Sequence, residues 1–164
     1  MSIRYRTTRF GEIEFGEEVV ITFPDGILGF PEERRYLLLE HDAAGSPFKW
    51  LQSLDNPDLA FIVVDPSLID PTYNVDLDTD LVRLIGTDDP QQCAVMCIVN
   101  VPHDHPVHMT ANLKAPLVVS VETRRGRQTI LGSQAYAIST PVFPHLADSA
   151  EEEDSAPLVS RLAS

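Results

Sequence analysis

The sequence TANLKAPLVVSVETRRGRQTIL at residues 110–131 carries the pattern around which the rest of the chain is arranged. Two apolar runs, residues 117–121 and 129–131, flank a polar turn at residues 123–127. Both runs are rich in β-branched side chains, whose crowding at Cβ suits a pleated strand better than a helix. A tight turn of this kind needs a residue with positive φ, and we expect Gly126 to supply it. The pattern therefore predicts a β-hairpin.

The residues that lead into this hairpin predict a turn followed by extended backbone. Asn112 is a small amide whose side chain can bond nearby backbone groups in a turn. Pro116 has no backbone donor and favours extended geometry in the residue before it. Nothing in residues 110–131 has the spacing of a nucleophile, a phosphate-binding loop or a metal site, so we interpret the segment as scaffold.

Strand signals recur along the chain on both sides of the hairpin. Alternating or continuous apolar runs, bounded by Gly, Pro, Asn or Asp, are typical of strands. Such runs predict strands at residues 4–10, 11–15, 19–23, 36–39, 48–53, 59–64, 93–101 and 135–138. Residues 71–77 should be extended chain, with a short helical turn at residues 32–35. Asp78 or Thr79 should cap a short helix over residues 81–85, which Gly86 should end.

This sequence of elements predicts a mainly β fold, a single antiparallel barrel-like or sandwich domain with few short helices. Its core should contain the largest apolar side chains of the expected strands. The residues expected in the core are Trp50, Phe61, Ile62, Val64, Val95, Cys97, Val99, Val119 and Ile130.

The chain of 164 residues is long enough for one domain with its own core. We place this domain at residues 1–143. Residues 144–164 contain a block of negative charge and no apolar period, so we expect a disordered acidic tail. No apolar run approaches the ~20 residues of a transmembrane helix, and no secretory signal follows the N-terminus. Cys93 and Cys97 have no redox or zinc spacing and are expected to be free thiols in a reducing cytoplasm.

The net charge of −13 is unevenly distributed. Residues 41–100 hold ten Asp and no Glu against Lys49 and Arg83, a net charge of −8, whereas residues 101–143 carry a net charge of +2. An acidic surface repels phosphates, which excludes direct nucleic-acid binding as the leading function. Such a surface can meet a basic protein, and the alternative is that the acidity serves solubility alone.

Candidate catalytic groups are few. His103, His105 and His108 could form a metal site, although two prolines bracket them as they would an exposed loop. Asp76, Asp78 and Asp80 would share one wet face of a strand, and a wet face does not raise the pKa that a general acid needs. No nucleophile elbow and no glycine-rich phosphate loop is present. A metal-dependent enzyme or metal-binding protein using the three histidines therefore stays the alternative to a binding protein.

A succession of motifs resembles the FliW family of flagellar assembly factors across about residues 3–143. The motifs are FPDGILGF at residues 23–30, LQS at residues 51–53, TANLKAP at residues 110–116 and GRQTIL at residues 126–131. Leu28 and Ser120 depart from the family pattern, which usually has proline and asparagine there. The residues that carry the resemblance are Gly26, Gly29, Phe30, Gln52, Ser53, Thr110, Asn112, Leu113, Ala115, Pro116, Gly126 and Gln128.

The resemblance implies a small β-barrel-like protein of the cytoplasm with no catalytic activity and no cofactor. It also implies two alternative partners, flagellin and the translational repressor CsrA, with no direct contact to nucleic acid or membrane. Because CsrA has basic surfaces, opposite charges would raise the association rate. We therefore predict a partner-binding surface on an acidic strand, formed by Tyr73, Asn74, Asp76, Asp78 and Asp80.

Overall fold

The structure is a computed structural model that describes residues 2–40 and 46–143. The strands in this part of the chain are β1 (Ser2–Thr7), β2 (Gly11–Gly16), β3 (Ile21–Thr22), β4 (Arg35–Glu40), β5 (Phe48–Ser53), β6 (Ala60–Val64), β7 (Cys93–Asn100), β8 (Thr110–Ala111), β9 (Leu117–Ser120), β10 (Gly126–Gln128) and β11 (Thr140–Pro141). The helices are η1 (Glu17–Val19), η2 (Pro66–Leu68), α1 (Thr79–Ile85), η3 (Pro90–Gln92) and η4 (Pro106–His108). The prediction of a mainly β domain with few short helices is confirmed, and the predicted tail at residues 144–164 lies outside the described residues.

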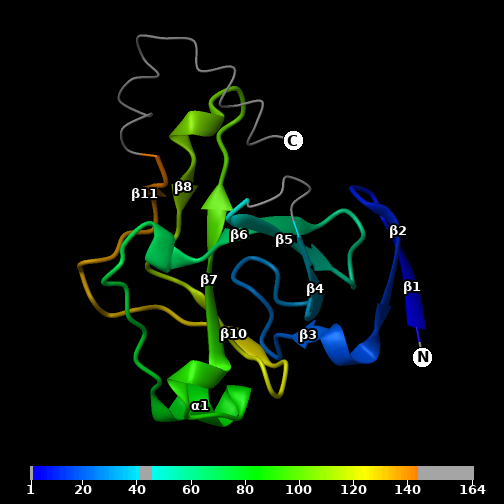
Figure 1. Ribbon diagram of the computed structural model, residues 1–164, viewed down its shortest axis with the longest axis horizontal. Coiled ribbons are helices and arrows are strands. Elements are labelled where there is room, and N and C mark those ends of the chain that lie inside the picture. The colour runs from blue at the N-terminus through cyan, green and yellow to red at the C-terminus, as the bar shows by residue number, and fades with distance from the viewer. Residues whose placement is uncertain (1, 41–45, 144–164) are drawn as a thin grey trace.

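One large antiparallel sheet forms the body of the molecule, with β7 as its long central strand (Figure 1). The strand order is β10-β9-β7-β6-β5-β4-β3, and β8 adds to β7 and carries β11. The two ends of this order meet, because Thr22 of β3 forms a parallel bridge with Arg125 just before β10. The Thr22 N–H donates to the Arg124 carbonyl at 2.9 Å. The sheet is therefore barrel-like, closed at one short seam.

A separate hairpin of β1 and β2 packs beside β4 and β5 (Figure 1). Its buried Phe15 joins Val20, Leu37 and Leu54 in a small apolar cluster. The main interior cluster lies on the opposite face of β4, because successive side chains of a strand point to opposite faces. That cluster contains Ile21, Phe23, Ile27, Tyr36, Leu51, Val63, Met96, Leu117 and Val119.

The predicted core is confirmed in part. Val64, Cys97, Val99 and Val119 are buried, whereas Trp50, Phe61, Ile62 and Val95 are only half-buried. Ile130 was expected in the core and is 64% exposed, so that prediction is wrong. The reason is that β10 ends at Gln128, and Ile130 lies beyond it at the rim of a surface groove.

The hairpin is present with a register that differs from the predicted one. Its second strand is β10, not residues 129–131, and the residue with positive φ is Arg124 at 60°, not Gly126. The Arg124 guanidinium donates to the Val19 carbonyl at 2.8 Å, which holds the turn against η1. Gly126 is needed for close packing instead, since a Cβ there would lie 2.8 Å from Cε1 of Phe23.

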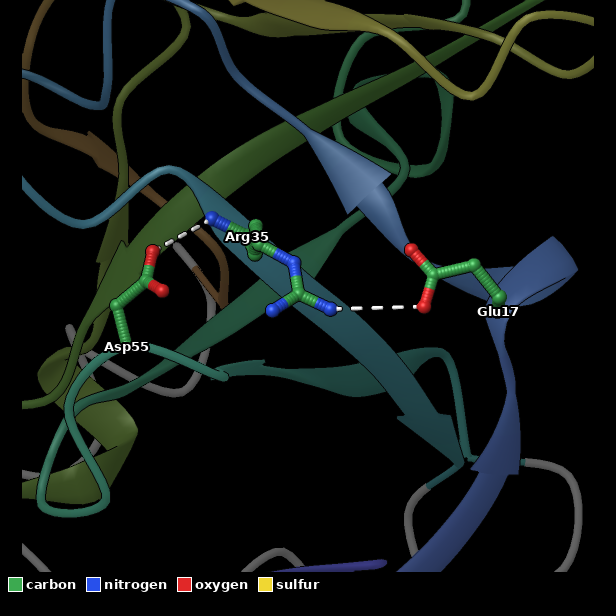
Figure 2. Close-up of polar contacts among 3 residues, drawn as sticks. All are labelled: Glu17, Arg35 and Asp55. Carbon is green, nitrogen blue, oxygen red and sulfur yellow. Dashed lines mark hydrogen bonds and ion pairs between the residues drawn. The ribbon is translucent and has the colours of Figure 1, made fainter. Parts of the chain in front are cut away.

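Three smaller predictions are also corrected. Residues 32–35 form no helical turn, because the N–H groups of Arg34 and Arg35 donate to the Asp55 carboxylate at 2.7 and 2.9 Å. Figure 2 shows Arg35 between Asp55 and Glu17. The Glu17 carboxylate pairs with the Arg35 guanidinium at 3.7 Å. The strand predicted at residues 19–23 is shortened to β3 by η1. Residues 135–138 form a loop, and the last described strand is β11.

A groove beside an acidic segment

The predicted acidic strand is an extended segment without strand pairing, and its last residue belongs to a helix. Residues 73–78 carry no strand assignment, and Asp80 lies in α1. The expected alternation persists: Asn74, Asp76 and Asp78 are exposed, whereas the side chains between them are half-buried. One side of the segment is therefore polar, as predicted, but its backbone is not a strand of the sheet.

The apolar side of this segment is fixed to the rest of the fold. The Tyr73 hydroxyl donates to the Leu113 carbonyl, and its ring packs against Tyr136 at 4.5 Å between centroids. Val75 and Leu77 pack against the cluster of α1 and β9 side chains. Tyr73 thus has a structural role, and the groups left for a partner are those on the polar side.

Asp78 has its carboxylate engaged within the chain. It is the N-cap of α1 and accepts a hydrogen bond from the Leu81 N–H at 2.8 Å. Gly86 ends the helix in the left-handed conformation at φ 86°. The predicted helix and both of its caps are confirmed. Asp76 and Asp80 keep exposed carboxylates, so the acidic surface rests mainly on these two residues.

A groove of about 490 Å³ lies between this segment and the sheet, and we call it the barrel-end groove. In Figure 1 the connection from β6 to α1 runs alongside β7. The sheet contributes Leu38 of β4, Val63 of β6 and Met96 of β7. The connection contributes Val75 and Leu77. The remaining lining residues are Pro47, Lys49, Val64, Asp65, Pro66, Ser67, Tyr73, Asn74, Pro90, Cys93, Ala94 and Val95.

The titratable groups near the groove are not activated for nucleophilic chemistry. Burial, with a smaller contribution from Asp89, raises the pKa of the Cys93 thiol. Burial raises the pKa of Cys97 to about 12, and it raises the pKa of Tyr73 as well. A thiol reacts as its thiolate, which a raised pKa makes scarce at neutral pH. Cys93 and Tyr73 therefore line the groove without being activated as nucleophiles, and Cys97 is a buried core residue.

The three histidines of the alternative prediction do not converge on one point. His103 and His105 are exposed, and Nε2 of His103 lies 3.5 Å from the Asp104 carboxylate. The rings of His105 and His108 meet edge to face at 5.6 Å between centroids. Across residues 2–40 and 46–143, no three His, Cys, Asp or Glu side chains are placed to hold a metal ion. The geometry does not favour the metal-dependent alternative.

A metal analysis tests this interpretation directly. The purified protein should contain no stoichiometric transition metal, and replacing His103, His105 and His108 together by alanine should leave partner binding unchanged. Elemental analysis by mass spectrometry measures the first quantity and calorimetry the second. One tightly bound zinc or iron per chain, lost in the triple variant, would favour the metal-dependent alternative.

Three of the motif residues, Gly26, Gly29 and Gln128, line a second groove that is distinct from the barrel-end groove. The Gln128 side chain accepts from the Leu28 N–H at 2.8 Å and donates to the Ala115 carbonyl at 3.0 Å. Asn112 accepts from the N–H groups of Lys114 and Ala115, as expected of a turn amide. Residues 25–29 and 127–130 line the groove between them, with a volume of about 500 Å³. The motif therefore joins three distant segments into one rigid corner.

Pattern analysis missed the residues that line the barrel-end groove on the sheet side. Leu38, Val63 and Met96 come from three strands, and each reads as an ordinary core position in its own strand. Only the tertiary structure brings these three side chains to one cluster and one groove. Nothing in the sequence around Lys49 indicated that this residue lines a groove.

Comparison with known proteins gives a consistent match. The family model for FliW protein matches residues 4–142. The flagellar assembly factor FliW of Caldanaerobacter subterraneus subsp. tengcongensis is 41% identical over 140 residues, covering 85% of this chain and 93% of that protein. The flagellar assembly factor FliW of Thermoanaerobacter pseudethanolicus is 36% identical over 144 residues, covering 88% of this chain and 95% of that protein. A crystal structure of the flagellar assembly factor FliW has a TM-score of 0.78 at 35% identity, covering 87% and 98%. Within the described residues, no helix is long and apolar enough to span a bilayer.

Proposed function

The chain belongs to the FliW protein family, and we propose that it is a non-enzymatic cytoplasmic binding protein of flagellar assembly. In this proposal it binds flagellin and the translational repressor CsrA in alternation. Free protein keeps CsrA away from flagellin messenger RNA, and rising flagellin captures the protein and restores repression. The observation that carries the proposal is the family match over residues 4–142, which spans nearly the whole described fold.

The chemistry of the described residues supports a binding role over a catalytic one. The thiols near the barrel-end groove have raised pKa values, and within the described residues no three His, Cys, Asp or Glu side chains are placed to hold a metal ion. We propose that residues 1–143 are the binding domain and residues 144–164 an accessory acidic tail. The function requires no cofactor and no direct contact with nucleic acid or membrane.

We place the surface for the basic partner at the polar side of residues 73–80, formed by Asn74, Asp76, Asp78 and Asp80, while Tyr73 of the predicted set anchors the segment to the fold. The support is the exposure of Asn74, Asp76 and Asp80 together with the net charge of −8 in residues 41–100. Charges of this kind act mainly on the association rate. Because each exposed ion pair contributes only ~0–1 kcal/mol, the surface works through several carboxylates at once.

A competition experiment with purified proteins tests the function. The full chain should bind CsrA and release it when flagellin is added, and the released CsrA should again bind flagellin messenger RNA. Calorimetry and an RNA mobility shift measure the two steps. Absence of binding to both proteins would refute the proposal, whereas binding of only one would remove the alternation.

Neutralising the acidic surface should weaken CsrA binding by about 1–2 kcal/mol, or roughly tenfold, chiefly through slower association. The variant replaces Asp76, Asp78 and Asp80 by asparagine. Asparagine is as good an N-cap as aspartate, so α1 should persist. Surface plasmon resonance at several salt concentrations separates the association rate from the dissociation rate.

The matched control removes the same amount of charge from the tail by replacing Glu151, Glu152 and Glu153 with glutamine. This control should change CsrA affinity much less. If the tail variant loses affinity for CsrA and the surface variant does not, the binding site lies on the tail and its assignment to residues 73–80 is wrong. If neither loses affinity, the acidity serves solubility.

A further inference from the structure

We propose that the barrel-end groove receives apolar side chains from a partner segment in which lysine or arginine residues flank the apolar ones. This inference rests on the proposed binding function and adds the chemistry of the segment that is bound. It enlarges the contact from a set of carboxylates to an apolar groove with an acidic rim.

The floor and one wall of the groove are apolar. Leu38, Val63 and Met96 come from neighbouring strands and belong to or pack on the main interior cluster, so the floor continues the core to the surface. Val75 and Leu77 form the wall on the side of the acidic segment. Val63 and Met96 are buried, so the accessible apolar surface belongs mainly to the half-buried Leu38, Val75 and Leu77. Contact with apolar side chains of a partner would remove this surface from water, which favours association.

The rim of the groove is acidic. Lys49 is the lysine of the lining, and Nζ lies 3.3 Å from the Glu40 carboxylate, which offsets its charge. Asp65 lines the groove with an exposed side chain, and Asp89 directly precedes Pro90 of the lining. Asp89 lies near enough to Cys93 to raise its pKa. Apolar floor and acidic rim together are complementary to an apolar segment with basic flanks.

The same charges disfavour two other occupants. A second copy of the chain carries a net charge of −13 and would place an acidic rim against an acidic rim. The chain's own residues 158–162 include Leu158 and Leu162, but they follow four consecutive acidic residues at 151–154. Like charges brought together raise the free energy of a complex. The basic segment of a partner is the occupant that the charges select.

The test fills the groove from a position that is exposed in the free protein. Ala94 of β7 is exposed and lines the groove, so Ala94→Trp adds bulk there without removing a buried contact. Ser67→Trp does the same from the side of η2, in case the first variant does not fold. Ala135→Trp, on an exposed loop that does not line the groove, is the matched control.

The probes are three short fluorescein-labelled synthetic peptides, measured by fluorescence anisotropy. The first has leucines flanked by lysines, the second has the lysines replaced by glutamate, and the third has the leucines replaced by serine. The first peptide should bind the wild-type protein and the Ala135→Trp control at least about tenfold more tightly than it binds the groove-filling variants. The other two peptides should bind the wild-type protein weakly, and CsrA should lose affinity for the groove-filling variants by a similar factor.

The outcomes separate this inference from the proposed function. If wild-type protein binds CsrA and the groove-filling variants bind it equally well, the inference is wrong and the proposed function stands. If wild-type protein binds neither CsrA nor flagellin, the proposed function fails. Tight binding of the glutamate-flanked peptide, a concentration-dependent dimer lost in the Ala94→Trp variant, or a gain in peptide affinity on deleting residues 144–164 would each assign the groove to a different occupant and overturn the inference.

Discussion

Replacing Gln52 by alanine should lower the free energy of unfolding by about 3 kcal/mol. Gln52 is 0% exposed at the end of β5, and its Nε2 donates to the Ser53 carbonyl at 2.9 Å and to the Leu59 carbonyl at 3.1 Å. These bonds hold the turn that joins β5 to β6. The variant leaves both carbonyls without this donor and leaves a cavity the size of the lost side chain. In the wild-type protein the Gln52 Oε1 accepts no hydrogen bond from any described residue, which reduces the net loss.

Equilibrium unfolding in urea, followed by the fluorescence of Trp50, measures this change. The matched control is Gln91→Ala, since Gln91 is exposed and its side chain makes no hydrogen bond with any described residue. The control should stay within about 0.5 kcal/mol of wild type. A loss at Gln52 no larger than the loss at Gln91 would mean that other groups hold the turn.

Replacing Gly126 by alanine should lower the free energy of unfolding by about 1–3 kcal/mol, although it adds only one methyl group. A Cβ at Gly126 would lie 2.8 Å from Cε1 of Phe23 and 2.9 Å from Cγ2 of Val119. Both neighbours are buried, and Phe23 packs edge to face against Tyr36. The Phe23 ring cannot move aside without disturbing the Tyr36 ring, so we expect β10 to shift outward instead.

Gly132→Ala is the matched control for this substitution. A Cβ at Gly132 meets nothing within 4 Å, and the backbone there is not in the left-handed region. Thermal unfolding of the two variants side by side should show a lower midpoint for Gly126→Ala alone. Equal midpoints would contradict the packing role of Gly126.

The parts of the fold that sequence could predict are those in which a local signal determines the structure. Strands β4 to β7 coincide with their predicted runs within about two residues, because apolar runs and Asp-Pro or Asn-Pro turns give local signals of where these strands lie. The hairpin register could not be predicted in this way. Choosing Gly126 for the left-handed position follows intrinsic preference, but Arg124 adopts that conformation because its guanidinium reaches Val19 and its N–H reaches the Ser120 carbonyl. The bond to Ser120 is local, but the contact with Val19 depends on tertiary structure.

The same distinction applies to the candidate site. The role of Asp78 as a helix cap was predictable, since the cap and its helix are adjacent in sequence. Whether residues 73–78 pair with another strand could not be predicted. The alternation of polar and apolar residues distinguishes the two faces of an extended segment but does not show whether another strand lies beside it. The barrel-end groove required the relative positions of β4, β6 and β7, which no single strand contains.

The seam between Thr22 and Arg125 has a consequence for how the chain folds during synthesis. The two sides of the seam lie far apart in the sequence, as the contact between Val19 and Arg124 shows with its separation of 105 positions. A ribosome releases the N-terminal side long before the C-terminal side exists, so β3 leaves the exit tunnel without its seam partner. Contacts of such long sequence separation form slowly, because the intervening chain must give up its freedom first. The nascent protein therefore carries an open sheet edge at β3 until β10 has emerged and completed the barrel.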